Sequence, residues 1–545
     1  MRRLLLTLLT FIVVASAEAA DVKKMFILGG ELSNSAATCT DDMDNLMPRM
    51  KDIGLNTILV PAYWELIEKE EGEFDFSLID RTINKAREND LKVVFLWFGA
   101  WKNSMSCYAP LWFKQNYKKY PRSRTLGGKP LEIASAFSEK VFQADNRAFG
   151  ALMQHIADTD KQTGTVIMMQ IENEIGMLTD ARDHSNLANK EYEKGVPAEL
   201  MNYLKHAQLH PWMKDRFTGK GKSWAEVFGN DVYSDEIFMA YHYAKYVERL
   251  AKTARSIYND MPLYVNTALN SRGRKPGEYP SAGPLAHLID VWHCGAPSID
   301  MLSPDIYDTG FKNWSSQYAL WNNPLFIPEA RCCNNSGARA LYAFGEHRAL
   351  GFSPFAIDQA SPRDIMPITK SYKMLNEIKP LLNGNKTYGL LFDQEDKERT
   401  IADGNTVMIC RHYFTLPWDS RATDGSTWDE GGAIIIKLAD NDYVVAGTGV
   451  VITFATGITG NKHDDENKLG EDGFALKQGD KAVITNKKFN GKLKGIGSVD
   501  EVNVDKTGKM TYLRRLNGDQ DHQGRHVRIA VGDYKILHVR LYDYE

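Results

Sequence analysis

Between residues 25 and 375 the chain alternates eight short apolar runs with amphipathic segments. Segments such as Leu78–Glu88, Asp145–Asp158 and Ile237–Tyr258 repeat their apolar residues at helical spacing. Strands that alternate with helices favour a parallel sheet, because each helix supplies the crossover that parallel strands need. The apolar runs predict strands at Met25–Gly30, Thr57–Val60, Val93–Trp97, Val166–Ile171, Leu263–Asn266, Met301–Ser303, Leu325–Ile327 and Ser353–Ile357.

Eight strand–helix units suit one (β/α)8 barrel, whose active groups stand at the carboxyl ends of its strands. An open, doubly wound sheet is the competing fold, but no GxGxxG pattern follows the first predicted strand. The largest insertion, residues 178–234, follows the fourth strand and carries Trp212 and Trp224. We therefore predict an α/β fold, with a (β/α)8 TIM barrel over residues 20–383 that ends in a helix at Tyr372–Leu382.

Beyond Asn383 the composition shifts to Gly, Asp, Thr, Val and Asn, and turn pairs such as Asp403-Gly404 separate short apolar runs. This pattern predicts a C-terminal β-sandwich over residues 384–545. Its Trp418 and Trp428 are candidates for polysaccharide contact, but we expect the domain mainly to support the barrel. Its strands are predicted at Thr406–Tyr413, Gly432–Leu438, Tyr443–Thr453, Lys481–Thr485, Met510–Leu513, His526–Val531 and Tyr534–Tyr542.

The N-terminus predicts export. Arg2 and Arg3 precede an apolar run at Leu4–Val14, and a small-x-small site follows that ends at Ala19. The run is too short to cross a bilayer, so the pattern is that of a signal peptide over residues 1–19. No later stretch is long and apolar enough to span a membrane. We expect a periplasmic or secreted protein without a membrane span.

Charge and motif content exclude several classes of partner. The chain has 66 Lys and Arg against 70 Asp and Glu, a formal net charge of −4. This balance gives no electrostatic reason to expect nucleic acid or an anionic membrane surface. Neither a CxxC spacing nor a His pair beside a carboxylate occurs, so the sequence predicts no metal and no cofactor. The oligomeric state stays open.

Carboxylates follow two of the predicted strands. Glu172 and Glu174 come directly after the fourth strand, and Glu329 comes directly after the seventh. Side chains two residues apart on a strand point to the same face, so the pattern does not choose between Glu172 and Glu174. A pair of facing carboxyl groups suits glycosidic bond cleavage, with one group as acid and the other as nucleophile. Asn173 could then bond the sugar hydroxyl beside the reacting carbon. The alternative is that these Glu residues pair with Arg at the barrel rim.

Several strings together resemble glycoside hydrolase family 35. They are Gly54–Ile58, Trp64, Glu71–Ser77 and Gln170–Gly176. These proteins are retaining β-galactosidases of the (β/α)8 clan A, and the resemblance covers most of residues 25–375. It implies that Glu174 is the general acid/base, that Glu329 is the nucleophile, and that Tyr307, after the sixth strand, donates a hydrogen bond to that nucleophile.

Two segments depart from the better-known members of that family. Val60–Glu68 lacks their usual Tyr and His-Glu, and Phe98–Ser104 stands where they carry a CAEW-like string. Both lie where galactose hydroxyls would be recognised, so the sugar is less firmly implied than the mechanism. The pattern is closer to a bacterial branch that ends in an uncharacterised β domain. Some members of that branch remove galactose from plant polysaccharides, which makes xyloglucan-type side chains a plausible substrate.

Other residues after the strands could contact a sugar. Trp101 could stack on its apolar face, and Asn103 could bond a hydroxyl, whereas Lys102 is expected to lie at the rim or to form a salt bridge. Glu31 and Asn34, after the first strand, could bond the terminal sugar of an exo-acting site.

Two alternatives to a β-galactosidase stay open. The first keeps the barrel and changes the sugar, giving a β-glucosidase, an endo-β-glycanase or a mannanase. The second is a carbohydrate-binding protein without catalysis. In every case the expected partner is an oligosaccharide or polysaccharide.

Overall fold

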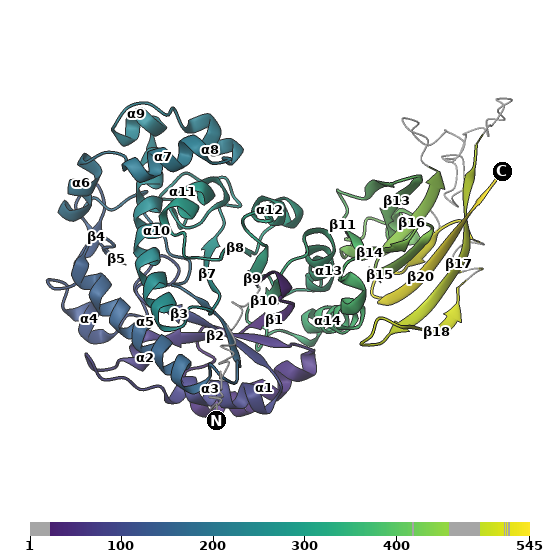
Figure 1. The fold of residues 1–545 in the computed structure, drawn as a ribbon, viewed down its shortest axis with the longest axis horizontal. Coiled ribbons are helices and arrows are strands. Elements are labelled where there is room, and N and C mark those ends of the chain that lie inside the picture. The colour runs from purple at the N-terminus through teal and green to yellow at the C-terminus, as the bar shows by residue number, and fades with distance from the viewer. Residues whose placement is uncertain (1–21, 417–418, 457–490, 517, 519, 521–523) are drawn as a thin grey trace, which may run out of the picture.

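The computed structural model describes residues 22–416, 419–456, 491–516, 518, 520 and 524–545. A helix-wrapped barrel is followed by a pair of antiparallel sheets, which lie to the right of the barrel in Figure 1. The predicted signal peptide, residues 1–19, lies outside the described residues. Within those residues, no helix combines the length and apolar character that a bilayer crossing needs.

The barrel is closed and all its strand pairs are parallel, which confirms the predicted (β/α)8 fold. The strands neighbour one another in the order β1-β10-β9-β8-β7-β6-β3-β2. Their bounds are β1 Ile27–Glu31, β2 Thr57–Tyr63, β3 Lys92–Phe98, β6 Val166–Gln170, β7 Leu263–Ala268, β8 Met301–Ile306, β9 Phe326–Ala330 and β10 Gly351–Pro354.

The barrel helices begin earlier than the apolar periodicity predicts. In α5 the Ser138 hydroxyl accepts from the Val141 backbone N–H, and in α10 Asp231 accepts from Tyr233. Polar caps of this kind satisfy the free N–H groups at the start of a helix. They add no apolar residue to the helical pattern, so the apolar periodicity does not reveal the first turns. The main helices are α1 Thr40–Ile53, α3 Ser77–Glu88, α5 Glu139–Thr159, α10 Val232–Ile257, α11 Ile289–Gly295, α12 Phe311–Tyr318, α13 Ser336–His347 and α14 Pro362–Leu382.

Two insertions lengthen loops of the barrel. After β3 come a short helix and a hairpin, and after β6 comes a group of four small helices (Figure 1). The tryptophans of the larger insertion pack against other side chains: Trp224 is buried, and Trp212 lies edge-on to Tyr233 and His287. The short elements are α2 Trp64–Ile67, α4 Leu111–Gln115, β4 Arg122–Arg124, β5 Pro130–Ala134, α6 Asn186–Glu193, α7 Ala198–His206, α8 Pro211–Arg216 and α9 Trp224–Phe228.

The C-terminal part is a β-sandwich, as predicted. A six-stranded sheet, ordered β11-β14-β15-β20-β17-β18, faces a four-stranded sheet, ordered β12-β13-β16-β19. The strands are β11 Lys386–Phe392, β12 Glu398–Asp403, β13 Thr406–His412, β14 Gly431–Ala439, β15 Asp442–Thr448, β16 Val450–Thr456, β17 Leu493–Val504, β18 Met510–Arg515, β19 Val527–Ile529 and β20 Lys535–Tyr544.

The prediction of one strand at Tyr443–Thr453 is wrong, because this segment forms two strands that belong to different sheets. β15 and β16 are separated by Gly449, whose φ is +69°. A Cβ at Gly449 would lie 2.8 Å from the Gly431 Cα, so only glycine permits this crossing. The apolar run itself is continuous, which is why the sequence hides the break. The strand predicted at Lys481–Thr485 lies outside the described residues.

The sandwich packs directly on the barrel. α13 and α14 lie between the two parts (Figure 1), and Ile434 and Ile536 of the six-stranded sheet share the hydrophobic cluster of the barrel helices. Gly345 of α13 allows close approach, since a Cβ there would meet Ile434 at 2.9 Å. Arg339 adds two hydrogen bonds to Glu430, of 2.9 and 2.6 Å. The sheet therefore supports the back of the barrel.

Trp428 does not offer a surface for polysaccharide. Its ring is buried and stacks on His412, with the ring centroids 4.9 Å apart. Trp418 lies outside the described residues.

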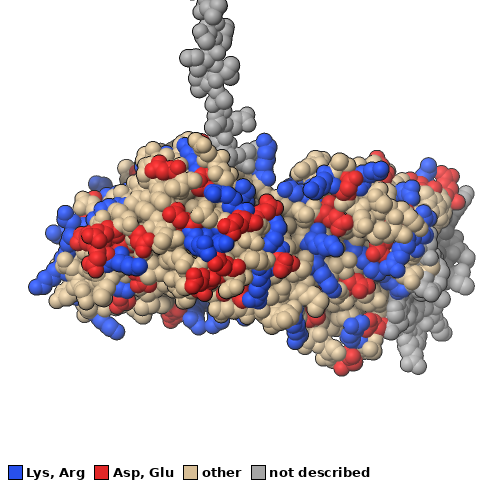
Figure 2. All heavy atoms as spheres, turned by 90° about the horizontal axis from the view of Figure 1, so that it is seen from below, with Lys and Arg blue, Asp and Glu red and all other residues tan. Residues whose placement is uncertain are grey.

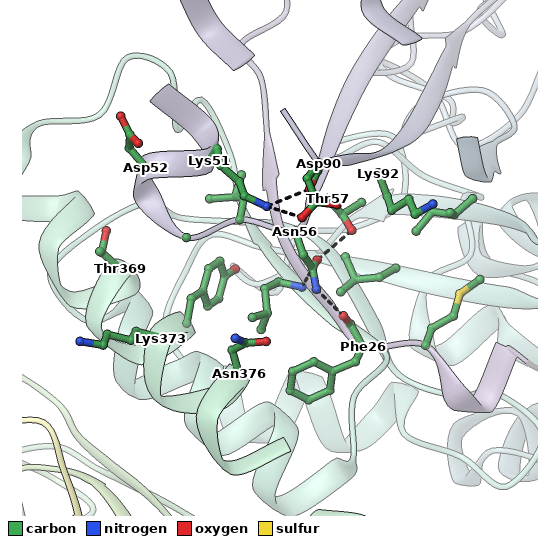
Figure 3. Close-up of a pocket in the computed structure, with 17 residues that line it drawn as sticks. Phe26, Lys51, Asp52, Asn56, Thr57, Asp90, Lys92, Thr369, Lys373 and Asn376 are labelled. Atoms are coloured by element: carbon green, nitrogen blue, oxygen red, sulfur yellow. Dashed lines mark hydrogen bonds and ion pairs between the residues drawn. The ribbon is translucent and has the colours of Figure 1, made fainter. Parts of the chain in front are cut away.

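A cleft of 720 Å³ lies at the amino ends of the barrel strands. Figure 3 shows Lys51 directed at Asp90, at 2.9 Å, and the Asn56 amide donating to the Phe26 carbonyl at 2.8 Å. Two pairs of lining residues thus bond each other, Lys51 with Asp90 and Asn56 with Phe26. In a barrel this end supports stability, whereas active sites are built at the opposite end.

The surface carries both signs of charge. On the face seen in Figure 2, basic and acidic side chains are interspersed over both parts of the molecule, without a continuous region of one sign among the residues coloured there. A face of this kind provides no long-range steering of a charged ligand.

Candidate active site

Four carboxyl groups converge at the carboxyl ends of the barrel strands. Glu31 ends β1, Glu174 follows β6, Asp305 lies on β8 and Glu329 lies on β9. All four are buried, and one oxygen each of Glu174, Asp305 and Glu329 lie within 4.8 Å of one another. The sequence placed Glu174 and Glu329 at strand ends, and the fold brings them face to face.

The loop after β6 separates the two glutamates that the sequence could not distinguish. β6 ends at Gln170, and Glu172 and Glu174 both have left-handed backbones, with φ of +58° and +44°. The alternating side-chain directions of strand β6 therefore end before either glutamate. The expectation that Glu172 and Glu174 point the same way is wrong. A non-glycine residue in this region costs about 1–3 kcal/mol, and such strain concentrates at functional sites.

The loop after β3 runs beside the loop after β6. The Asn103 N–H donates to the Asn173 carbonyl at 3.2 Å, and the Ser104 N–H donates to the Glu174 carbonyl at 3.1 Å. Asn103 and Ser104 also have positive φ, of +49° and +62°. The two loops hold each other in these strained conformations, which fixes the backbone of Glu174.

Three donors surround the Glu329 carboxylate. The Tyr307 hydroxyl donates to Oε2 at 2.6 Å. The amides of Asn173 and Asn266 donate to Oε1 at 3.2 and 3.1 Å. Hydrogen bonds to both oxygens fix the orientation of this carboxylate.

Glu174 is held in a different electrostatic state. Burial, together with the negative charge of Glu329, raises the pKa of Glu174 to about 7, although the nearby Lys102 ammonium opposes the rise. Its backbone N–H donates to the Asn266 side-chain oxygen at 2.9 Å, and the Asn103 amide donates to its Oε2. Glu174 can therefore carry a proton at neutral pH while it faces Glu329.

Glu31 and Asn34 line the same end of the barrel. Burial, together with the charges of Glu329 and Glu174, raises the pKa of Glu31 well above its ordinary value. Within the described residues, neither carboxyl oxygen of Glu31 nor the buried side-chain oxygen of Asn34 has a hydrogen-bond partner in the protein. Buried polar atoms without partners are costly, so these three oxygens are suited to bonding a ligand.

Trp101 is not placed to stack on a sugar. Its indole is fully buried and lies edge-on to Tyr243 and Tyr246 of α10, with ring centroids 5.5 and 4.8 Å away. Its backbone N–H donates to Glu172 Oε2 at 2.8 Å. Because no face of the ring is exposed, this position argues against the predicted contact, and Glu172 serves to tie down the Trp101 backbone.

Three further residues take part in the site. The Asn266 side chain contacts Glu174, Asp305 and Glu329. Burial and the neighbouring Glu329 raise the pKa of Asp305 well above its ordinary value. Lys102, predicted at the rim or in a salt bridge, is only 4% exposed. The sequence signal available for these residues was their position at or near strand ends.

The oxygens of Glu174, Asp305 and Glu329 are close enough together to hold a metal ion. However, phenol and amide hydrogens already point at both oxygens of Glu329. These donors suit an anion and would oppose a cation, so the donor set favours a site that works with protons.

Tyr307→Phe tests the role of the phenol. Removing one charge-assisted hydrogen bond costs about 1.5–3 kcal/mol, so we expect kcat on an aryl glycoside to fall roughly 10- to 100-fold. KM should change little, because the phenol holds the attacking carboxylate and not the substrate. Tyr318→Phe, which removes a buried hydroxyl bonded to the Pro284 carbonyl, is the control. A kcat within twofold of wild type would contradict the assignment.

A closed parallel barrel with two buried carboxyl groups facing each other at the carboxyl ends of its strands defines a glycoside hydrolase type of site. The family described as "Glycosyl hydrolases family 35" matches residues 19–268. This match confirms the resemblance that the sequence motifs predicted. A "Domain of unknown function (DUF5597)" matches residues 368–528. No curated protein matches the chain.

Solved structures with a likeness to this chain include three β-galactosidases. The enzyme from the psychrophilic Marinomonas ef1 is 14% identical, with a TM-score of 0.44 over 65% of this chain and 59% of its own. The cold-adapted enzyme from Rahnella sp. R3 is 15% identical, with a TM-score of 0.47 over 66% and 57%. The polyextremophilic enzyme from the Antarctic haloarchaeon Halorubrum lacusprofundi is 14% identical, with a TM-score of 0.44 over 64% and 58%. The match thus spans less than two thirds of each of these solved chains.

Proposed function

We propose that the protein is an exported, retaining β-galactosidase that removes terminal galactose from an oligosaccharide or polysaccharide. The observation that carries this proposal is the facing pair Glu174 and Glu329, whose oxygens lie within 4.8 Å. Retaining glycosidases hold their two carboxyl groups about 5–5.5 Å apart, whereas inverting enzymes need about 6.5–9.5 Å to admit a water. The spacing therefore supports direct attack by one carboxylate.

In the first step, Glu174 donates its proton to the glycosidic oxygen while Glu329 attacks the anomeric carbon. The C–O bond to the leaving group breaks, and an ester between the sugar and Glu329 forms. Tyr307 and Asn266 keep the attacking carboxylate oriented and ionised until it reacts. Asn173, beside Glu174, could bond the hydroxyl next to the reacting carbon, a contact that strengthens in the transition state.

In the second step, the roles of Glu174 reverse. Once Glu329 is an ester it has lost its charge, so one of the causes that raise the pKa of Glu174 disappears. Glu174, now a carboxylate, takes a proton from water as the water attacks the anomeric carbon. The ester breaks, Glu329 leaves as a carboxylate, and the β configuration is restored. One acid/base group thus serves both half-reactions.

We assign recognition of the terminal sugar to buried side-chain oxygens that have no hydrogen-bond partner among the described residues. Glu31 and Asn34 could accept hydrogen bonds from sugar hydroxyls, and the Asn103 amide lies next to Glu174. Side chains of plant polysaccharides such as xyloglucan are the substrate we favour. The near-neutral net charge of the chain agrees with an uncharged glycan.

A screen of aryl glycosides tests this function. Wild-type protein should release the aryl group fastest from the β-galactoside, and product NMR should show β-galactose before mutarotation. Xyloglucan oligosaccharides with and without terminal galactose then test the substrate class. Faster hydrolysis of a β-glucoside or mannoside, or internal cleavage of a glycan, would replace the galactosidase by the alternative enzymes. Glycan binding without turnover would indicate a carbohydrate-binding protein.

A further inference from the structure

One ammonium group lies among the four carboxyl groups. Lys102, in the loop after β3, is 4% exposed, and its Nζ donates to the Asn173 side-chain oxygen at 2.8 Å. The same Nζ lies 4.8 Å above the centre of the Phe98 ring. The proposed mechanism assigns this group no step, yet a buried charge persists only where its surroundings compensate for desolvation.

The surroundings of Lys102 supply that compensation. Burial alone would lower the pKa of this ammonium, but attraction from Glu329, Glu174 and Glu31 outweighs the penalty and leaves the pKa raised. Lys102 in turn opposes the rise in the pKa of Glu174 and of Glu31. The titratable groups that face Lys102 are Glu31 from β1, Glu174 from the loop after β6, Asp305 from β8, Glu329 from β9, and Cys107 and Tyr108 from its own loop.

We infer that Lys102 is a positioning residue that orients the Asn173 amide toward Glu329 and supplies the counter-charge for the ionised nucleophile. This inference rests on the proposed function, since it concerns the carboxylate that attacks. It assigns Lys102 no contact with the reacting atoms.

The amide of Asn173 explains the first half of this role. Its oxygen accepts from Lys102 Nζ, and its nitrogen donates to Glu329 Oε1 at 3.2 Å. An ammonium can only donate, so the amide cannot rotate by half a turn without facing Lys102 with its own hydrogens. Lys102 therefore selects the orientation in which Asn173 stabilises the Glu329 carboxylate.

Charge balance explains the second half. With Glu174 protonated and Glu329 ionised, Lys102 and Glu329 leave the buried cluster close to neutral. The attraction between Lys102 and Glu329 offsets the cost of burying each charge. Without Lys102, an ionised Glu329 would be a buried anion among three other carboxyl groups, which is costly.

Lys102→Met removes the charge and keeps the apolar stem against Phe98. We expect kcat on an aryl β-galactoside to fall about 100-fold, as for a mispositioned reacting group. The basic limb of the kcat/KM profile should move to higher pH, because Lys102 opposes the rise in the pKa of Glu174. Lys102→Arg should keep the limb near its wild-type position. Lys102→Gln retains a donor for Asn173 without charge, so it should shift the limb as Met does while losing less kcat.

The matched control is Lys114→Met in the neighbouring helix α4. Lys114 donates to the Cys107 carbonyl at 2.8 Å and lies 3.7 Å from Glu65, away from the four carboxyl groups. It should leave the limb in place. Thermal unfolding identifies any variant that does not fold, and Lys102→Gln then replaces Lys102→Met. A folded, charge-free variant whose basic limb stays within about 0.2 pH unit of wild type would overturn the inference, whatever its kcat. A wild type that hydrolyses no aryl glycoside would instead overturn the proposed function, and this inference with it.

Discussion

Glu329→Gln is expected to lower kcat on an aryl β-galactoside by about 10,000-fold or more. An amide oxygen is a far weaker nucleophile than a carboxylate, and without covalent attack the first step has no acceptor for the anomeric carbon. The side-chain volume is unchanged, and Tyr307 can still donate to the amide oxygen. The loss should therefore appear in turnover, while the thermal midpoint stays near that of wild type.

Covalent trapping makes this result specific. A 2-deoxy-2-fluoro galactoside with a good leaving group should label the wild type at Glu329, as peptide mass spectrometry would show, and should leave Glu329→Gln unlabelled. Glu71→Gln is the control, because Glu71 lies at the surface and bonds Lys119 and Tyr120. A Glu329→Gln enzyme within tenfold of wild-type kcat, or a label on another carboxylate, would exclude Glu329 as the nucleophile.

The barrel could be predicted from sequence because its signal is repetitive. Each strand is a separate apolar run, and each helix carries its own period, so an error in one element does not alter the fold class. In the sandwich the signal is weaker. β17 is rich in glycine and charged residues, and no strand was predicted there, while the division between β15 and β16 depends on the single φ of Gly449.

Within the site, the sequence identified the residues that end strands but not how they contact one another. Glu174 was separated from Glu172 only by family resemblance, because the positive φ values that turn them apart are imposed by the neighbouring loop. Four carboxyl groups from distant segments stabilise the charge of the buried Lys102. No local sequence pattern reveals that these groups meet. Trp101 was misjudged for the same reason, since α10 covers a side chain that composition alone would place against a sugar.

Glu174→Gln should slow the two half-reactions to different extents, and which of them is slowed should depend on the leaving group of the substrate. For an unactivated galactosyl oligosaccharide, loss of the proton donor should lower kcat/KM about 1,000-fold. For a dinitrophenyl galactoside, whose leaving group needs no proton, the first step should survive and the second should slow, since water has lost its base. A burst of dinitrophenol should therefore precede slow turnover. Azide, a nucleophile that needs no base, should restore the rate and give β-galactosyl azide.

The pH profile gives the same assignment independently. Because the pKa of Glu174 is raised to about 7, the acid form is present below that pH and is lost above it. The wild-type kcat/KM for an unactivated substrate should therefore fall as pH rises through about 7, and Glu174→Gln should abolish this basic limb. Glu172→Gln is the matched control, two residues away. Burial and the neighbouring Asp145 raise the pKa of Glu172 well above its ordinary value, so its protonated form is closely mimicked by glutamine. That variant should keep the limb. A basic limb that persists in Glu174→Gln would assign the proton donor to another group, with Asp305 the nearest buried candidate.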